Sequence, residues 1–103
     1  MSLTITNASN VLTCRFSGKM DTPTCTRIDA ELSKALSTFD ASADGARIAF
    51  EMAEVDYVAS VFLRFCVKAA KAAGPGKFTV TSISPSVRKI FKIAGLSDCL
   101  PSV

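Results

Sequence analysis

The stretch that decides the fold is Val55-Asp56-Tyr57-Val58-Ala59-Ser60-Val61-Phe62-Leu63-Arg64. Its pattern predicts the end of a strand, a short turn and the first turn of a helix, with Ser60 where turn and helix meet. A helix start leaves several backbone N–H groups without partners and carries partial positive charge. Ser60 is therefore expected either to cap this helix with its hydroxyl oxygen or to carry a phosphate that those N–H groups favour.

Length and composition set the class of protein. A chain of 103 residues with 49% hydrophobic and 20% charged residues is expected to form one globular domain, residues 1–103. The sequence does not open with a basic flank and a long apolar run, and no apolar segment approaches the roughly 20 residues that span a bilayer. These patterns predict a cytoplasmic protein without a membrane span.

Upstream of the stretch, the spacing of apolar residues predicts two strands, a helix and a further strand. Residues 2–6 and 12–17 alternate between polar and apolar around a turn at Ser9-Asn10, which predicts a β-hairpin. Between residues 23 and 38, apolar residues recur at three- and four-residue steps and predict an amphipathic helix. Alternation over residues 46–52 then predicts a strand that leads into the stretch.

Downstream, the pattern predicts another strand and another helix. The helix of the quoted stretch ends at Gly74-Pro75-Gly76, and residues 77–83, rich in β-branched side chains, predict a strand. Ser84-Pro85 combines a capping residue with a proline suited to the first helical position, and Gly95 ends that helix. Residues 96–103 are expected to add an edge strand. The predicted fold is therefore α/β, in the order β-β-α-β-α-β-α, with a mostly parallel sheet, an antiparallel N-terminal edge strand and helices packed on the sheet.

Charge is distributed unevenly along the chain. Residues 1–54 contain five Lys or Arg and seven Asp or Glu, whereas residues 55–103 contain seven and two. The second part carries a formal charge of +5, which predicts either solvent-facing helix sides or a mildly basic face toward an acidic partner or anion. Because no arginine cluster alternates with aromatic residues, the pattern does not favour nucleic-acid binding.

Patterns for catalysis and metal binding are missing from the sequence. The chain has no histidine, which removes the commonest general base and the usual Ser-His-Asp and Cys-His arrangements. Neither GxxxxGK[ST] nor GxGxxG is present. Asp21 and Asp56 could form an acid/base pair, but they are interpreted as surface carboxylates, so we expect no catalytic residue, no cofactor and no metal. The widely spaced cysteines are expected to be small buried residues: Cys14, Cys25, Cys66 and Cys99.

Three segments resemble the STAS domain family, which includes bacterial anti-sigma factor antagonists. They are Gly18-Lys19-Met20-Asp21 after one strand, Val55-Asp56-Tyr57-Val58-Ala59-Ser60 after another, and Gly95-Leu96 after the last helix. The resemblance covers nearly the whole chain, in element order as well as in motif. It implies that Ser60 is the family serine phosphorylated by a partner kinase, and that the family's turn aspartate, Asp21, lies close to it.

The chain departs from the family pattern beside this serine. Ala59 stands where the family has an aspartate, and Val61 and Phe62 stand where it has a small residue and a glycine. Val61 and Phe65 flank the apolar stripe of the helix, and they are interpreted either as core residues or as an exposed patch for a partner. The resemblance implies partner contacts at Asp21, Tyr57, Ala59, Ser60, Val61, Phe62 and Arg64.

The implied function is non-enzymatic regulation of transcription. The protein would bind an anti-sigma factor, itself a kinase-like ATPase that phosphorylates serine, and so free a sigma factor. Phosphorylation of Ser60 would weaken this binding by placing charge in the interface. Small STAS proteins also resemble the accessory subunit that binds the ATPase of lipid-transport ABC systems, and the altered serine segment fits this alternative as well. A small-molecule or nucleotide sensor is a third hypothesis, and a homodimer is left open.

Overall fold

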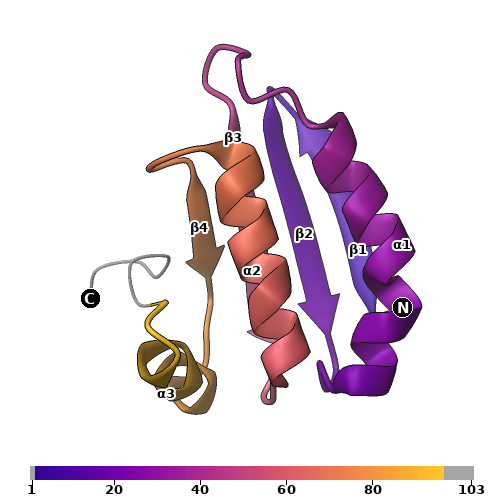
Figure 1. Ribbon diagram of the computed structural model, residues 1–103, viewed down its shortest axis with the longest axis vertical. Coiled ribbons are helices and arrows are strands. Elements are labelled where there is room, and N and C mark those ends of the chain that lie inside the picture. Colours follow the sequence, from indigo (N-terminus) through magenta and orange to yellow (C-terminus); the bar gives the residue numbers. More distant parts are fainter. Residues whose placement is uncertain (1, 97–103) are drawn as a thin grey trace.

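The computed structural model describes residues 2–96, which form a mixed sheet of four strands with three helices (Figure 1). The strands lie in the order β1-β2-β3-β4, and the chain confirms the predicted β-β-α-β-α-β-α fold. Along the chain, the elements are β1 (Leu3–Ala8), β2 (Val11–Ser17), α1 (Thr22–Thr38), β3 (Arg47–Glu54), α2 (Ser60–Ala73), β4 (Phe78–Thr81) and α3 (Pro85–Ile93).

Strands β1 and β2 form the antiparallel hairpin that the sequence predicts. Ser9 and Asn10 make its two-residue turn with φ of 53° and 67°, the left-handed backbone that suits the twist of a hairpin. The Asn10 side-chain amide also donates to the Asp44 carbonyl oxygen (3.0 Å), which ties the hairpin turn to the loop before β3. The antiparallel strand β1 is therefore one edge of the sheet, as expected.

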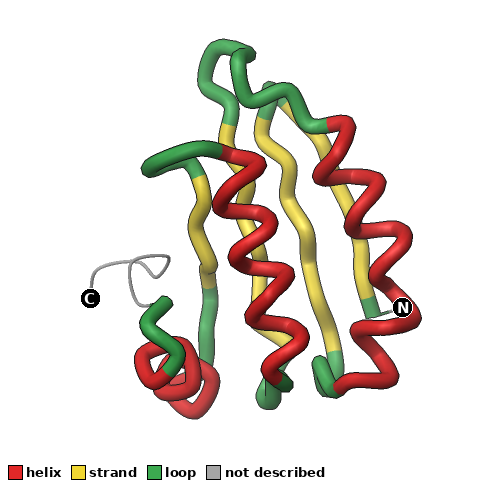
Figure 2. The backbone as a smooth tube through the Cα atoms, viewed as in Figure 1, coloured by secondary structure: helices red, strands yellow, loops and turns green. Residues whose placement is uncertain are grey.

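Strands β2, β3 and β4 are parallel, so their carboxyl ends meet at one edge of the sheet. Helices α1 and α2 cover the same face of the sheet, and α3 lies beyond the end of β4 (Figure 1). The loops that lead into the three helices all lie at the edge where the parallel strands end (Figure 2). This arrangement brings three helix N-termini to one end of the molecule.

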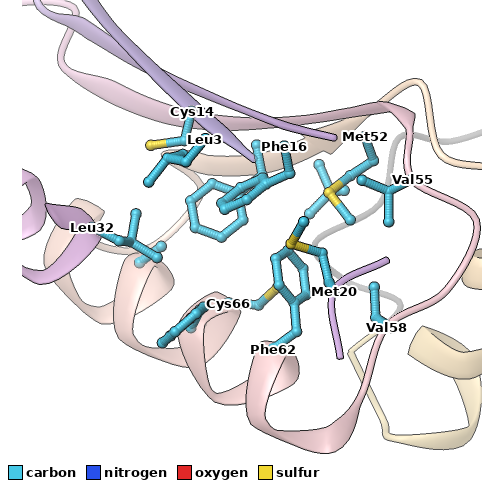
Figure 3. Packing of buried hydrophobic residues seen from close by; sticks show 14 of the residues in the cluster. Leu3, Cys14, Phe16, Met20, Leu32, Met52, Val55, Val58, Phe62 and Cys66 are labelled. Carbon is cyan, nitrogen blue, oxygen red and sulfur yellow. The ribbon is translucent and has the colours of Figure 1, made fainter. Parts of the chain in front are cut away.

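The core lies between the sheet and the two helices that cover it. Phe62 and Cys66 extend from α2 toward the sheet, where the Phe62 ring stands edge-on to Phe16 with centroids 4.9 Å apart (Figure 3). Such aromatic pairs add about 0.5–1.5 kcal/mol beyond the burial of their area. Alternate residues of β3 are fully buried beneath the helices: Ile48, Phe50 and Met52. This packing fixes the rotation of α2 and so decides which of its side chains face solvent.

The cysteines are part of this core. Cys14, Cys25 and Cys66 are all buried, which confirms the expectation for these three, and Cys99 lies outside the described residues. Burial raises the pKa of the Cys14 thiol to about 12. Burial, together with the negative charges of Asp21 and Asp29, raises the pKa of Cys25 to about 11. Thiols held protonated in this way are poor nucleophiles.

Element boundaries depart from the sequence predictions at a few points. Strand β4 ends at Thr81, before the predicted end at residue 83, because Ser82 has a φ of 56° that interrupts the extended backbone. Leu96 is not part of a strand, and the rest of the predicted edge strand, residues 97–103, lies outside the described residues. None of the helices within residues 2–96 has the length and the apolar run that crossing a membrane requires.

Candidate functional site

The turn before α2 is bonded to the turn before α1. The Met20 N–H donates to the Tyr57 carbonyl oxygen (2.9 Å), and the Ala59 N–H donates to the Met20 carbonyl oxygen (2.9 Å). These bonds make a parallel bridge between Met20 and Val58, whose side chains are both buried. Figure 3 shows Met20 beside Phe62 in the core. Asp21, which follows Met20 directly, is thereby held next to the segment that leads into α2.

Helix α2 starts without a side-chain cap. Its N-cap residue is Ala59, whose backbone is extended (φ −89°, ψ 167°) and whose methyl group offers no hydrogen-bond acceptor. Ser60 is the first helical residue, so the alternative in which its hydroxyl caps the helix is wrong. The other two described helices do have side-chain caps, because Asp21 accepts the Thr24 N–H and Ser84 accepts the Val87 N–H.

Ser60 is exposed at this helix start, and its hydroxyl has no hydrogen-bond partner within residues 2–96. The rotation of α2 explains the exposure. Phe62 and Cys66 are fully buried, and a residue two positions before Phe62 lies about 200° away around the helix axis. The Ser60 side chain therefore emerges on the side of α2 that faces away from the sheet, where another molecule can reach it.

The structure divides the predicted partner-binding residues into accessible and buried ones. Phe62 is fully buried and Phe65 is only 4% exposed, with their ring centroids 6.1 Å apart. Partner contact at Phe62 and an exposed patch at Phe65 are therefore corrected, because both rings belong to the core. Val61 is half-buried and packs against that core. The remaining predicted positions are at least partly exposed: Asp21, Tyr57, Ala59, Ser60 and Arg64.

A shallow pocket lies at the two bonded turns. Its volume is about 420 Å³, and it is lined by Lys19, Asp21, Asp56 and Tyr57. With two carboxylates against one ammonium group, the lining has an excess of negative charge. Tyr57 is 46% exposed, so part of its ring is open to a ligand group. Among residues 2–96, no group of three or more His, Cys, Asp or Glu side chains is placed to hold a metal ion.

Two of the pocket residues, Lys19 and Asp56, were not among the predicted site residues. Both lie inside the segments that resemble the STAS family, and both follow strands whose carboxyl ends meet at one edge of a parallel sheet. Residues at that edge commonly form the binding site of an α/β fold. Applied to the predicted strand ends, this rule would have placed Lys19 and Asp56 near Asp21.

Asp21 stabilises the start of α1 as well as lining the pocket. Its Oδ1 accepts the Thr24 N–H (3.0 Å). Hydrogen bonding with the Thr24 side chain and with this N–H, together with a smaller contribution from the positive charge of Lys19, lowers the pKa of the Asp21 carboxyl. The carboxylate form is favoured because it is the better acceptor for an unpaired N–H of the first helical turn. Asp21 is therefore the N-cap of α1 as well as part of the pocket.

The family model of the STAS domain matches residues 2–102. The chain therefore belongs to the STAS family, which confirms the resemblance found in its sequence. A comparison with curated proteins finds no significant match.

Solved structures of anti-sigma factor antagonists have a similar fold. SpoIIAA in its unphosphorylated form gives a TM-score of 0.78 at 17% identity, covering 98% of this chain and 87% of that chain. The Bacillus cell fate determinant SpoIIAA in its phosphorylated form gives 0.65 at 17% identity, covering 98% and 90%. An anti-sigma-factor antagonist (STAS) domain protein from Planctomyces limnophilus gives 0.78 at 15% identity, covering 96% and 86%. At these identities, the likeness shows that the fold is shared.

Proposed function

We propose that this protein is an anti-sigma factor antagonist, a non-enzymatic module that binds an anti-sigma factor with serine-kinase activity and is switched by phosphorylation of Ser60. The observation that carries the proposal is the exposed Ser60 hydroxyl at the first residue of α2, which has no hydrogen-bond partner within residues 2–96. Family membership supports the proposal, as does the shared fold with SpoIIAA, for which unphosphorylated and phosphorylated forms are known.

The residues that depart from the family pattern leave the hydroxyl accessible. Phe62 is turned into the core and Val61 packs partly against it, so neither large side chain stands in front of Ser60. Ala59 contributes only a methyl group. In the transfer, Ser60 Oγ forms a bond to the γ-phosphorus of ATP, the bond to the bridging oxygen breaks, ADP leaves, and the hydroxyl proton passes to a base of the kinase.

A phosphate on Ser60 would change the charge of this surface. It adds about −1.5 to −2 charges next to a pocket that already has an excess of carboxylates. A partner surface fitted to a neutral hydroxyl then faces repulsion and the cost of desolvating the phosphate. The unphosphorylated chain is therefore the expected binding form, and the phosphorylated chain is the expected released form.

The phosphorylation is tested with the purified chain, the candidate kinase from the same organism and Mg-ATP. Intact-mass spectrometry is expected to show the addition of one phosphate, and fragmentation is expected to place it on Ser60. Ser60→Ala should abolish the addition. Ser86→Ala, which removes another exposed hydroxyl near a helix start, should leave it unchanged. An unmodified wild-type chain, or a Ser60→Ala chain that still gains the phosphate, would contradict the switch.

The lack of a carboxylate at Ala59, where the family pattern has an aspartate, favours one alternative, the accessory subunit that binds the ATPase of a lipid-transport ABC system without a phosphoswitch. Affinity purification of the tagged chain from its own organism separates the two functions. Recovery of a kinase-like anti-sigma factor supports the first proposal. Recovery of an ABC ATPase, together with no change in its binding when Ser60 is replaced by Asp, supports the alternative.

A further inference from the structure

The outward side of α2 is a row of exposed cations that begins one turn after Ser60. Arg64, Lys68 and Lys71 follow at steps of four and three residues and are all exposed, with the 39% exposed Val67 among them. Helix α2 contains no Asp or Glu. Within residues 2–96, none of these three cations takes part in a hydrogen bond or an ion pair, so their charge is not neutralised by the chain itself.

The pocket on the other side of Ser60 has the opposite charge. Asp56 and Tyr57 precede Ser60 in the same segment, and Asp21 joins them through the backbone bridge between Met20 and Val58. Ser60 therefore stands at the boundary between an acidic pocket and a basic row. The boundary is built from two separate loops and a helix, and each of the three is held by hydrogen bonds or by core packing.

We propose that the protein partner carries the inverse of this pattern, with an acidic surface that lies along the row from Arg64 to Lys71 and a basic side chain that enters the pocket between Asp21 and Asp56. This inference rests on the proposed function, in that it describes the partner bound at the Ser60 surface. The half-exposed ring of Tyr57 gives such a cation an aromatic face to contact. Complementary charge of both signs fixes the orientation of a partner as well as attracting it.

The negative charge of the pocket also favours a protein partner over a uniformly anionic one. A nucleic acid or an anionic membrane would be attracted to Arg64, Lys68 and Lys71 but repelled by the two carboxylates of the pocket before the start of α2. A protein surface can place both signs of charge at the required positions. Phosphorylation of Ser60 would extend the acidic region to within one helical turn of Arg64, where the phosphate and the guanidinium can pair.

The charge pattern is tested by reversing one charge at a time and measuring the Kd for the partner by calorimetry at several salt concentrations. Arg64→Glu is expected to weaken binding about tenfold or more and to reduce its salt dependence. The matched control is Arg47→Glu, which makes the same charge change on the sheet face opposite to α2 and should alter Kd by less than about twofold. Equal effects of the two variants would show that only net charge matters, and would overturn the proposal.

The pocket has its own pair of variants. Asp56→Lys is expected to weaken binding about tenfold, whereas Asp44→Lys, in the loop at the opposite end of β3, should change Kd by less than about twofold. If Asp56→Lys bound the partner more tightly than the wild type, the proposal that a basic side chain enters the pocket would be wrong. Binding of the wild type to vesicles of phosphatidylglycerol, strengthened by Asp56→Lys, would show that an anionic membrane is the true occupant.

The same measurements separate this inference from the function on which it rests. If the chain binds no anti-sigma factor but does bind an ABC ATPase, the proposed function fails, and the four variants are measured against that ATPase. The inference holds if Arg64→Glu and Asp56→Lys are again the weakening pair. It is overturned if either partner binds all four variants equally well. Circular dichroism of each variant confirms that these exposed substitutions leave the fold intact.

Discussion

Helices α1 and α2 lie on the same face of the sheet but begin in different ways. α1 has the carboxylate of Asp21 as its cap and a proline in its first turn. α2 has Ala59 at the equivalent position and no side-chain cap, although a missing cap costs a helix about 1 kcal/mol. Natural proteins keep such local defects mainly at functional sites. The comparison shows that the start of α1 is stabilised by a side-chain cap, whereas the start of α2, where we propose that phosphorylation occurs, has none.

The two helices also differ in the charges that they expose. α1 carries Arg27 and Lys34 together with Asp29 and Glu31, so its charges balance. α2 carries three cations and no carboxylate. Uncompensated charges of one sign add repulsion within the free protein, and they gain favourable interactions only when an opposite charge arrives. The capped helix α1 therefore carries balanced charge, whereas the uncapped helix α2 carries a net positive charge.

The largest expected effect tests the boundary between core and surface within α2. Phe62→Ala should lower the free energy of unfolding by about 3–5 kcal/mol, because the ring is fully buried and the substitution leaves a cavity. The neighbouring half-buried Val61→Ala should cost less than about 1.5 kcal/mol. Urea denaturation measures both values. If Phe62→Ala does not fold, Phe62→Leu should show a smaller loss in the same direction. Equal costs at the two positions would mean that Phe62 is not in the core.

A smaller effect compares two serines at helix starts. Ser84→Ala should cost about 1 kcal/mol, because the Ser84 hydroxyl oxygen accepts the Val87 N–H (3.3 Å) at the start of α3. Ser60→Ala should change the free energy of unfolding by less than about 0.5 kcal/mol, because this hydroxyl caps nothing. Thermal or urea unfolding of the unphosphorylated proteins gives the comparison. A cost at Ser60 as large as that at Ser84 would show that Ser60 caps α2 in solution.

The smallest expected effect is the pH dependence that Asp21 gives to α1. Because its pKa is lower in the folded chain, Asp21 contributes stability above about pH 4 and loses this contribution as the pH falls through its folded value. Asp21→Asn keeps an acceptor at the cap but does not titrate, so it should lose less stability on acidification than the wild type. Asp40, whose pKa is also lowered, is unchanged in both proteins and cancels in the comparison. Urea unfolding between about pH 7 and pH 2.5 measures the loss of stability in both proteins. Equal losses would contradict the assignment of this pH dependence to Asp21.

Most of the fold was predictable, because hydrophobic spacing and turn residues agree along the chain. The start of α2 was not. Local preference favours Ser60 over Ala59 as an N-cap, but the bond from the Ala59 N–H to the Met20 carbonyl oxygen keeps Ala59 extended, so the helix begins one residue earlier than the serine pattern suggests. That bond joins residues far apart in the sequence and leaves no trace in local propensity.

Helical spacing and the family resemblance lead to different predictions for Phe62, and only the prediction from helical spacing is correct. The steps of four and three residues from Phe62 to Cys66 and Ala69 predict that Phe62 lies on the apolar side of α2, which the structure confirms, whereas the family resemblance placed it at a partner interface. The pocket required knowledge of the sheet order, because Lys19 and Asp56 come from loops after two different strands. A sequence gives the residues of each loop, but only the pairing of β2 with β3 puts the two loops together.

The bridge between Met20 and Val58 ties the start of α1 directly to the start of α2. Pulling the turns apart would break two backbone hydrogen bonds, and each buried group left without a partner costs about 1–3 kcal/mol. A protein that binds one turn and shifts it therefore also shifts the other turn, together with the first residues of two neighbouring helices. Force applied at Ser60 would reach the Asp21 cap without passing through the sheet.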